Sequence, residues 1–218
     1  SEEFRTAKGR KAAFENLKKF NIDGLIVIGG NGSFTGAHLL YEEFNIPVIG
    51  IPGTIDNDLY GTESPIGYDT ANNTVIECVD KIRDTASSHN RLFLVEVMGR
   101  DSGFIALNSA LATGALDVIL PEENQKLPEV FAEINRGVSH KKTSNIIIVA
   151  EGNKIGPTFE IAKAIKEKFP DFDTKVTILG HLQRGGSPST SDRILASRMG
   201  VAAVEALLNR KEDVMVGI

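Results

Sequence analysis

The chain has 218 residues, of which 41% are hydrophobic, and its 24 lysines and arginines against 29 aspartates and glutamates give a net charge of −5. This length allows one large domain or two smaller ones, and the apolar content excludes a disordered chain. The acidic balance argues against a general nucleic-acid or membrane-surface partner, and no apolar run reaches the roughly 18 residues of a membrane helix. With Cys78 as its single cysteine, we expect a cytoplasmic, soluble protein without a disulfide or zinc site.

Short β-branched apolar runs recur along the chain and predict strands. Each run is nearly continuous rather than alternating, which is typical of parallel strands buried on both faces. The segments between them show helical spacing, so the alternation predicts an α/β fold. The predicted strands lie at 25–30, 46–51, 91–97, 117–121, 145–152 and 175–181, and the clearest helices at 8–20, 70–88 and 129–139. Because residues 213–218 form a strand pattern with no helix after it, we expect a longer parent polypeptide.

A glycine-rich segment, Gly29 to Gly36, follows the first predicted strand and leads into a helix. In open α/β sheets, ligands bind beyond the carboxyl ends of the strands. Glycines permit positive φ and close approach of a ligand, and the start of a helix directs N–H groups at an anion. The segment therefore suits a phosphate, although it matches neither the P-loop nor the strict dinucleotide pattern. A simple glycine-rich turn between strand and helix is the alternative.

Two carboxylates, Asp56 and Asp58, follow the second predicted strand on either side of Asn57. In an extended loop both side chains point the same way, so both could face one site. One carboxylate could then accept a proton from an attacking hydroxyl while the other holds Mg²⁺. A solvated turn rich in aspartate and asparagine is the alternative.

Basic side chains lie at the ends of the later strands, namely Arg91, Arg100, His181 and Arg184. Several such groups converging beyond a sheet suit a phosphate monoester, whereas each one alone is explained by surface solvation. Glu151, at the end of another strand, could accept hydrogen bonds from sugar hydroxyls. Ser102 lacks the surroundings of a nucleophilic serine, and we expect it to cap a helix.

Together the ordered motifs GGNGS, PGTIDND, MGR and GHLQRGGSP resemble the ATP-dependent 6-phosphofructokinases, from about Phe4 to the C-terminus. The resemblance implies two Rossmann-like three-layer lobes with mainly parallel sheets and an active site in the cleft. Residues 1–67 and 182–218 would form an ATP-binding lobe, and 68–181 the fructose 6-phosphate lobe. The family's opening Gly-rich loop and first βα unit are absent, so the resemblance implies a fragment that could be inactive alone.

The resemblance also implies roles for individual residues. Asp56 matches the base that takes the proton from the 1-hydroxyl of fructose 6-phosphate, Arg100 matches the arginine that stabilises the transferring phosphoryl group, and Thr54 matches a neighbour in the catalytic loop. The implied sugar-phosphate contacts are Thr54, Asp56, Asp58, Arg91, Met98, Gly99, Arg100, Glu151, Lys175, His181 and Arg184, with Arg91 reaching into a neighbouring subunit's site. The implied ATP contacts are Arg5, Gly30, Asn31, Gly32, Ser33 and Gly36, and the implied Mg²⁺ contacts are Asn31 and Asp58.

Four positions bear on how far these roles carry over. Asn31 stands where the family commonly has a magnesium-associated aspartate, and Lys175 stands where an arginine commonly binds the 6-phosphate across the subunit boundary. Pyrophosphate-using relatives carry an acid at the position of Gly32 and a lysine at that of Gly53, so the two glycines favour ATP as the donor.

The sequence matches the effector site of bacterial family members only in part. Arg83 and Lys142 match basic effector-site residues of bacterial members, but Leu116 replaces an acid there. We therefore name no effector, although the family includes allosteric enzymes.

The resemblance implies ATP-dependent phosphorylation of fructose 6-phosphate to fructose 1,6-bisphosphate, the committed step of glycolysis, by a homotetramer of full-length chains. A different class of function stays open, namely a noncatalytic sugar-phosphate or nucleotide-binding fragment or a regulatory subunit. Less favoured enzymes are a pyrophosphate-dependent phosphofructokinase and an NAD or lipid kinase with a similar glycine loop.

Overall fold

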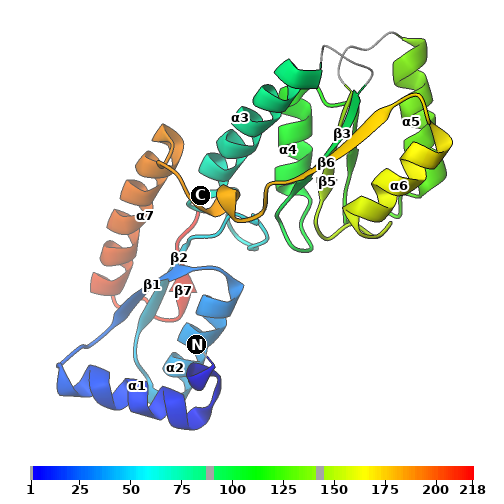
Figure 1. Ribbon diagram of the computed structural model, residues 1–218. Helices are drawn as coiled ribbons and strands as arrows, with labels where there is room; N and C mark the ends of the chain where they lie inside the picture. Colours follow the sequence, from blue (N-terminus) through cyan, green and yellow to red (C-terminus); the bar gives the residue numbers. More distant parts are fainter. Residues whose placement is uncertain (1, 87–90, 141–144) are drawn as a thin grey trace. The chain divides into compact units, whose positions relative to one another are not determined.

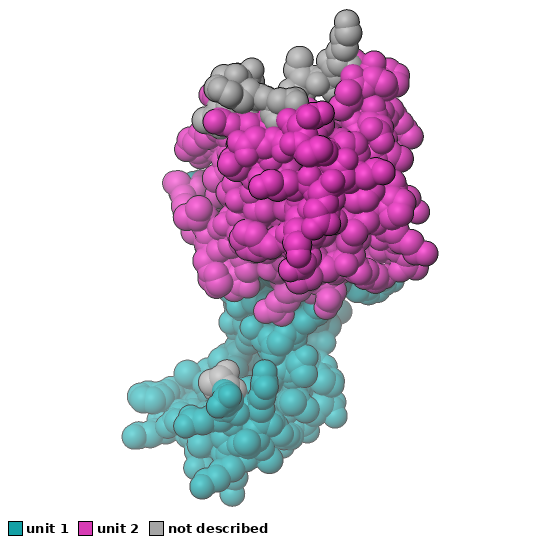
Figure 2. Space-filling model, turned by 45° about the vertical axis from the view of Figure 1, so that its right-hand side comes forward, with its two compact units in different colours: residues 1–54, 59–67, 190–218 teal, residues 55–58, 68–189 magenta. Residues whose placement is uncertain are grey.

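The computed structural model describes all residues except 1, 87–90 and 141–144. They form two compact units, coloured separately in Figure 2. Unit 1 comprises residues 1–54, 59–67 and 190–218, and unit 2 comprises residues 55–58 and 68–189. None of the helices within this described part of the chain is long and apolar enough to cross a membrane.

Two segments lie in a different unit from the predicted lobe. Residues 55–58 belong to unit 2 because Ile55 packs against its apolar core. Residues 182–189 also belong to unit 2, where the backbone N–H of Ser189 donates to Thr70 Oγ1 at 3.0 Å. The chain thus passes from unit 1 to unit 2 between residues 67 and 68, as in the predicted lobes, but returns between residues 189 and 190 rather than 181 and 182.

Unit 1 is built on a three-stranded parallel sheet with the order β1-β2-β7 (Figure 1). Along β2, Ile49 and Ile51 pack against Leu195 and Met199 of α7, whereas Gly50 faces Phe34 of α2. Alternate residues of a strand point to opposite faces, so α7 and α2 cover the two sides of this sheet. The elements are η1 (Glu3–Arg5), α1 (Ala7–Lys19), β1 (Leu25–Gly29), α2 (Asn31–Phe44), β2 (Val48–Pro52), α7 (Thr190–Leu208) and β7 (Val214–Met215).

Unit 2 contains a four-stranded parallel sheet with the order β4-β5-β3-β6. One face of the sheet, including Val95 and Ile148, packs under α3 and α4, and the other, including Leu94 and Ile147, under α5 and α6 (Figure 1). The elements are α3 (Tyr68–Ala86), β3 (Arg91–Val97), α4 (Phe104–Thr113), β4 (Asp117–Ile119), α5 (Leu127–Ser139), β5 (Ile146–Ala150), α6 (Thr158–Lys168), β6 (Asp173–Ile178) and η2 (Gly180–Arg184). The predicted α/β fold with parallel sheets is confirmed.

Candidate active site

The glycine-rich segment of unit 1 is mostly helix. α2 begins at Asn31, with Gly30 as its N-cap at φ −102° and ψ −165°. The N–H groups of Ser33 and Phe34 donate to the carbonyl of Gly30 at 3.0 and 3.1 Å. The prediction of a loop extending to Gly36 is therefore wrong. The helix starts early because Gly30 supplies the first acceptor and no residue after it prevents helical φ and ψ.

Gly29, Gly30, Gly32 and Gly36 all lack a positive φ, and at Gly29, Gly30 and Gly36 the missing Cβ instead allows close packing. A Cβ on Gly30 would lie 3.4 Å from Cβ of Thr54, and one on Gly36 would lie 3.1 Å from the ring of Phe4. Around Gly32, by contrast, no atom outside its chain neighbours and the nearby backbone of its own helix lies within 4 Å of the Cβ position. The first turn of α2 carries no acidic residue, so it offers an open helix N-terminus suited to a phosphate group.

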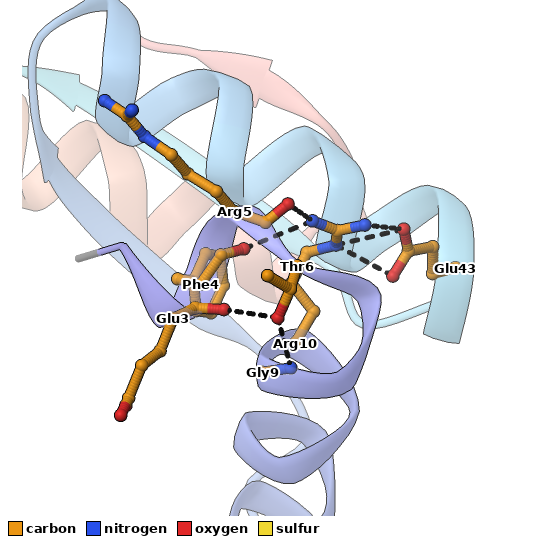
Figure 3. Close-up of polar contacts among 7 residues, drawn as sticks. All are labelled: Glu3, Phe4, Arg5, Thr6, Gly9, Arg10 and Glu43. Atoms are coloured by element: carbon orange, nitrogen blue, oxygen red, sulfur yellow. Dashed lines mark hydrogen bonds and ion pairs between the residues drawn. The ribbon is translucent and has the colours of Figure 1, made fainter.

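The segment that carries Arg5 is fixed to α2 by a buried guanidinium. Arg10 is 7% exposed; its Nε lies 3.0 and 2.9 Å from the two carboxylate oxygens of Glu43, and its Nη1 donates to the carbonyls of Phe4 and Arg5 at 3.2 and 2.8 Å. Figure 3 shows this guanidinium between its acceptors, with the Arg5 side chain extending away from it. The hydrogen bond from Arg10 also lowers the pKa of the Glu43 carboxyl. The exposed Arg5 side chain thus extends from a backbone that the Arg10 hydrogen bonds hold in place.

In unit 2, three predicted substrate segments meet at one edge of the sheet. Met98 follows β3, Glu151 follows β5 and Gly180 follows β6. These strands are neighbours, with Val97 opposite Ala150 in a parallel register. The carboxyl ends of parallel strands share an edge, so the MGR, Glu151 and GHLQR segments lie together there.

The MGR segment forms a constrained turn. Gly99 has a φ of 144°, and a Cβ there would lie 2.2 Å from the carbonyl oxygen of Ser102. Arg100 adopts a left-handed φ of 53°, which is uncommon for a residue with a side chain. The Glu151 carboxylate stabilises the turn, because its Oε1 accepts from the N–H groups of Gly99 and Arg100 at 3.2 and 2.8 Å. Glu151 therefore supports the loop, a role that the sequence analysis missed.

The turn places Arg100 beside Asp56. Nε of Arg100 lies 3.7 Å from Oδ2 of Asp56, and the Asp56 residue is only 6% exposed. Burial raises the pKa of the Asp56 carboxyl above its ordinary value of 3.8, while the positive charge of Arg100 acts in the opposite direction. The charge of Asp58 adds to the upward shift of this pKa, and that of Arg184 opposes it. Asp56 is thus a buried carboxylate of raised basicity beside a largely exposed guanidinium.

The expectation that Asp56 and Asp58 point the same way is wrong in its assumption of an extended loop. Asn57 between them has a left-handed φ of 51°, a conformation that asparagine tolerates better than most residues. Asp56 is consequently buried whereas Asp58 is exposed. Asp58 still lies close enough to influence the titration of Asp56.

Two predicted phosphate ligands lie at the opposite edge of the sheet. Arg91 is the first residue of β3, and Lys175 lies near the start of the adjacent β6. Both contact Asp173, at 3.6 Å from Arg91 Nε and 2.8 Å from Lys175 Nζ. A seven-residue strand spans roughly 20 Å, so within one chain Arg91 does not converge with Arg100. The expectation that Arg91 converges with Arg100, His181 and Arg184 is therefore wrong within one chain.

Ser102 differs from its sequence-based interpretation, and Gln183 makes contacts that the sequence did not indicate. Ser102 does not cap α4, whose N-cap is Gly103; the N–H of Gly103 instead donates to Glu122 Oε1 at 2.7 Å. Gln183 is 1% exposed and bonds to the backbone N–H of Met98, yet the sequence analysis gave it no role. Because the Gln183 side chain is neutral and lies between His181 and Arg184 in the sequence, its residue type does not indicate a role. Its burial in the structure does.

Of the three effector positions, the structure describes Arg83 and Leu116. Leu116 is buried in the core of unit 2, 8% exposed, where its methyl groups occupy the space beside Gly137. Packing therefore explains the leucine at this position. Arg83 donates to the carbonyl of Thr113, and Lys142 lies outside the described residues.

Within the described ranges, no group of three or more histidine, cysteine, aspartate or glutamate side chains is arranged to hold a metal ion. Mg²⁺ in phosphoryl-transfer sites is commonly held by one or two carboxylates together with substrate phosphates rather than by an all-protein cage. The exposed carboxylate of Asp58 fits that pattern of binding.

The chain is similar to known proteins over nearly its whole length. The sequence profile of the family described as Phosphofructokinase matches residues 1–207. The chain is 54% identical over 216 residues to ATP-dependent 6-phosphofructokinase 2 of Bacteroides thetaiotaomicron, covering 99% of this chain and 66% of that protein. It is 56% identical over 218 residues to ATP-dependent 6-phosphofructokinase of Cytophaga hutchinsonii, covering 100% and 66%.

A solved structure shows the same fold. The structure of Pichia pastoris phosphofructokinase in the T-state superposes with a TM-score of 0.91 at 35% identity, covering 100% of this chain and 27% of that one. The chain thus spans about 66% of the length of the bacterial relatives that it matches. With a family profile that covers nearly its whole length, the chain belongs to the phosphofructokinase family.

Proposed function

We propose that the full-length protein carrying this chain transfers the γ-phosphate of ATP to the 1-hydroxyl of fructose 6-phosphate. The products are ADP and fructose 1,6-bisphosphate. The observation that carries the proposal is the pair of Asp56 and Arg100, a buried carboxylate of raised pKa 3.7 Å from a guanidinium at the carboxyl edge of the sheet. Both bacterial relatives described above are named as ATP-dependent 6-phosphofructokinases, which supports the same reaction.

In the proposed reaction, Asp56 accepts the proton of the sugar 1-hydroxyl as its oxygen attacks the γ-phosphorus. A raised pKa makes the carboxylate a stronger base, although it must still be ionised at the working pH. The Arg100 side chain is 70% exposed and so is available to the negative charge of the transferring phosphoryl group. Phosphoryl transfer depends mainly on such positioning and charge neutralisation.

The remaining predicted contacts divide by unit. In unit 2, the exposed side chains of His181 and Arg184 would bind the sugar phosphate, together with Met98, Gly99 and Glu151. In unit 1, the open first turn of α2 and the anchored Arg5 would bind the nucleotide, through Gly30, Asn31, Gly32, Ser33 and Gly36. Thr54, which lies against Gly30, would contribute from the catalytic loop.

We also propose that Asp58 and Asn31 contribute oxygen ligands to Mg²⁺ in the complex with substrates. The ion would there neutralise charge on the nucleotide phosphates. The amide of Asn31 supplies no charge, so Asp58 would provide the main electrostatic attraction from the protein. We place the reaction in the cytoplasm, which suits a chain with a single unpaired cysteine, Cys78.

The site is proposed to be completed by a second subunit. Arg91 and Lys175 lie at the edge of the sheet remote from Asp56 and share one carboxylate, that of Asp173. We infer that their positive charges serve the sugar phosphate bound by another copy of the chain. A homo-oligomer, in the form of the expected homotetramer, therefore follows from the proposed function.

ATP is the proposed donor, and Gly32 provides the test. Gly32→Asp should raise the KM for ATP by roughly tenfold or more, because its carboxylate would repel the phosphates in the open first turn of α2. The KM for fructose 6-phosphate should not change. An aspartate at a helix N-terminus stabilises the helix, so the variant should fold. Gly32→Ala is the matched control and should bind ATP normally; equal KM values for ATP in both variants would contradict this donor site.

The raised pKa of Asp56 predicts the pH dependence of the reaction. Because the base must lose its proton, the acidic limb of the kcat/KM profile should lie above the ordinary aspartate value of 3.8. Arg100 lowers the pKa of Asp56, so Arg100→Met should move the limb to higher pH as well as reduce the rate. Initial rates measured across the acidic pH range give both profiles. An acidic limb that moves to lower pH in Arg100→Met would contradict the predicted effect of Arg100 on the pKa of Asp56.

The test of the function as a whole is a coupled assay of fructose 1,6-bisphosphate formation by the full-length protein. ATP and pyrophosphate would be compared as donors with Mg²⁺, and NAD⁺ and diacylglycerol as acceptors. Among these pairs, we expect product only with ATP as the donor and fructose 6-phosphate as the acceptor. Failure with every pair, in a folded protein that still binds the sugar phosphate, would instead indicate a noncatalytic binding protein.

A further inference from the structure

Gln183 is a buried side chain within an exposed segment. The five residues of η2, all described, include exposed side chains at His181, Leu182 and Arg184, whereas Gln183 is only 1% exposed. Burying an amide without partners costs free energy, so such a side chain is expected to make hydrogen bonds at both ends.

Both ends of the Gln183 amide are bonded. Its Oε1 accepts from the backbone N–H of Met98 at 3.1 Å, and its Nε2 donates to the carbonyl of Gly180 at 3.0 Å. Met98 is the first residue beyond β3, and Gly180 begins η2. The side chain thus links the segment that leads into Arg100 with the segment that carries His181 and Arg184.

The MGR turn depends on side chains for its backbone hydrogen bonds. Two side chains accept hydrogen bonds from the N–H groups of three consecutive residues. Gln183 accepts from Met98, and Glu151 accepts from Gly99 and Arg100. The turn also holds Gly99 and Arg100 at positive φ values of 144° and 53°, which an unsupported chain rarely adopts. Losing one of these acceptors should therefore loosen the turn that places Arg100 near Asp56.

We propose that Gln183 is a positioning residue that holds Arg100 in a fixed position relative to His181 and Arg184. The inference rests on the proposed function, in which Arg100 acts on the transferring phosphoryl group and η2 binds the sugar phosphate. Gln183 does not touch the substrate, because its side chain is buried beneath the exposed face of η2. Its role is to hold the distance between the two sets of positive charges.

The role predicts a specific kinetic pattern. Gln183→Met keeps the approximate size and removes both hydrogen bonds, so Arg100 and η2 should lose their fixed geometry. Small misplacements of catalytic groups are costly, and we expect kcat to fall by about 10- to 100-fold. The KM for fructose 6-phosphate should rise, whereas the KM for ATP should stay unchanged because the predicted nucleotide contacts lie in unit 1.

Gln125→Met is the matched control. Gln125 is a glutamine of unit 2 that is less buried than Gln183, and its Nε2 donates to Asp117 Oδ2 at 3.2 Å. This variant should lose its hydrogen bond to Asp117 while kcat and both KM values stay unchanged. Equal kinetic changes in the two variants would mean that any polar loss in unit 2 disturbs the site, and would overturn the proposal.

A second variant tests the hydrogen bonds themselves. In Gln183→Glu the ionised side chain cannot donate to Gly180, whereas its protonated form can both donate and accept as the native amide does. The activity of this variant, expressed relative to wild type at each pH, should therefore rise as the pH falls. A ratio that is constant with pH would contradict the proposed role.

Hydrogen exchange separates this inference from the proposed function. The amide of Met98 should exchange faster in Gln183→Met than in Gln125→Met, whatever reaction the protein performs. If the wild type forms fructose 1,6-bisphosphate but Gln183→Met leaves both the exchange and the kinetics unchanged, the inference fails and the function stands. If the wild type forms no product, the function fails, and unchanged exchange at Met98 would then overturn the positioning role separately.

Discussion

Replacing Asp56 with asparagine is expected to lower kcat by a factor of about 10²–10⁴ while leaving the binding of fructose 6-phosphate nearly unchanged. The amide has the shape of the carboxylate but cannot accept a proton from the sugar hydroxyl. Steady-state kinetics of the full-length variant, together with a direct binding measurement for the sugar phosphate, give both quantities. Asp56→Ser should show the same loss of turnover.

Loss of folding would not explain this result. Burial raises the pKa of Asp56, so the folded state favours the neutral carboxyl. The stability that this carboxyl contributes is fully present below its ordinary pKa of about 3.8 and is lost as the pH rises through the raised value. Asparagine is neutral at every pH, so at pH 7 the Tm of Asp56→Asn should equal or exceed that of the wild type. Normal turnover in a stable Asp56→Asn protein would contradict the assignment of the base.

Mixing two variants that are each impaired at low substrate concentration is expected to restore activity. Asp56→Asn removes the proposed base from one chain, and Arg91→Ala removes the phosphate ligand that the other chain would provide. Arg91→Ala alone should raise the KM for fructose 6-phosphate by roughly 10- to 100-fold, as expected for a lost charged hydrogen bond. Within a symmetric pair that shares its sites, a hybrid contains one intact site of two. Co-expressed variants should therefore recover about one quarter of wild-type activity at low substrate concentration.

A second mixture controls for nonspecific rescue. Arg91 and Lys175 lie on adjacent strands at the same edge and contact the same carboxylate, Asp173. If both serve a neighbouring subunit's site, then mixing Arg91→Ala with Lys175→Ala leaves every site without one of them. This mixture should stay at the activity of the separate variants. Restoration in the control, or its absence with Asp56→Asn, would contradict a site shared between subunits.

The strands and their edge could be predicted from the sequence because both follow from local apolar patterning. Continuous runs such as residues 146–150 are buried on both faces, as parallel strands between helices require. The rule that parallel strands gather their following residues at one edge then correctly placed Met98, Glu151 and His181 near each other. The same rule explains why Arg91 does not join them, since it precedes its strand.

The parts that could not be predicted depend on contacts between distant residues. The buried position of Gln183, the carboxylate of Glu122 at the start of α4 and the contact of Arg10 with Glu43 each join segments far apart in sequence. Backbone conformation was also hidden, because nothing in the residues MGR indicates a left-handed Arg100. The early start of α2 likewise follows from the geometry at Gly30 rather than from the weak helix propensity of its glycines.

Phosphorus NMR of the full-length protein with ATP, fructose 6-phosphate and Mg²⁺ tests the central claim most directly, because it identifies the carbon that receives the phosphate. The account predicts a new phosphate ester at carbon 1, formed in step with ADP by the wild type and slowed about 10²–10⁴-fold in Asp56→Asn. Phosphorylation at another position, or equal rates in the two proteins, would contradict it.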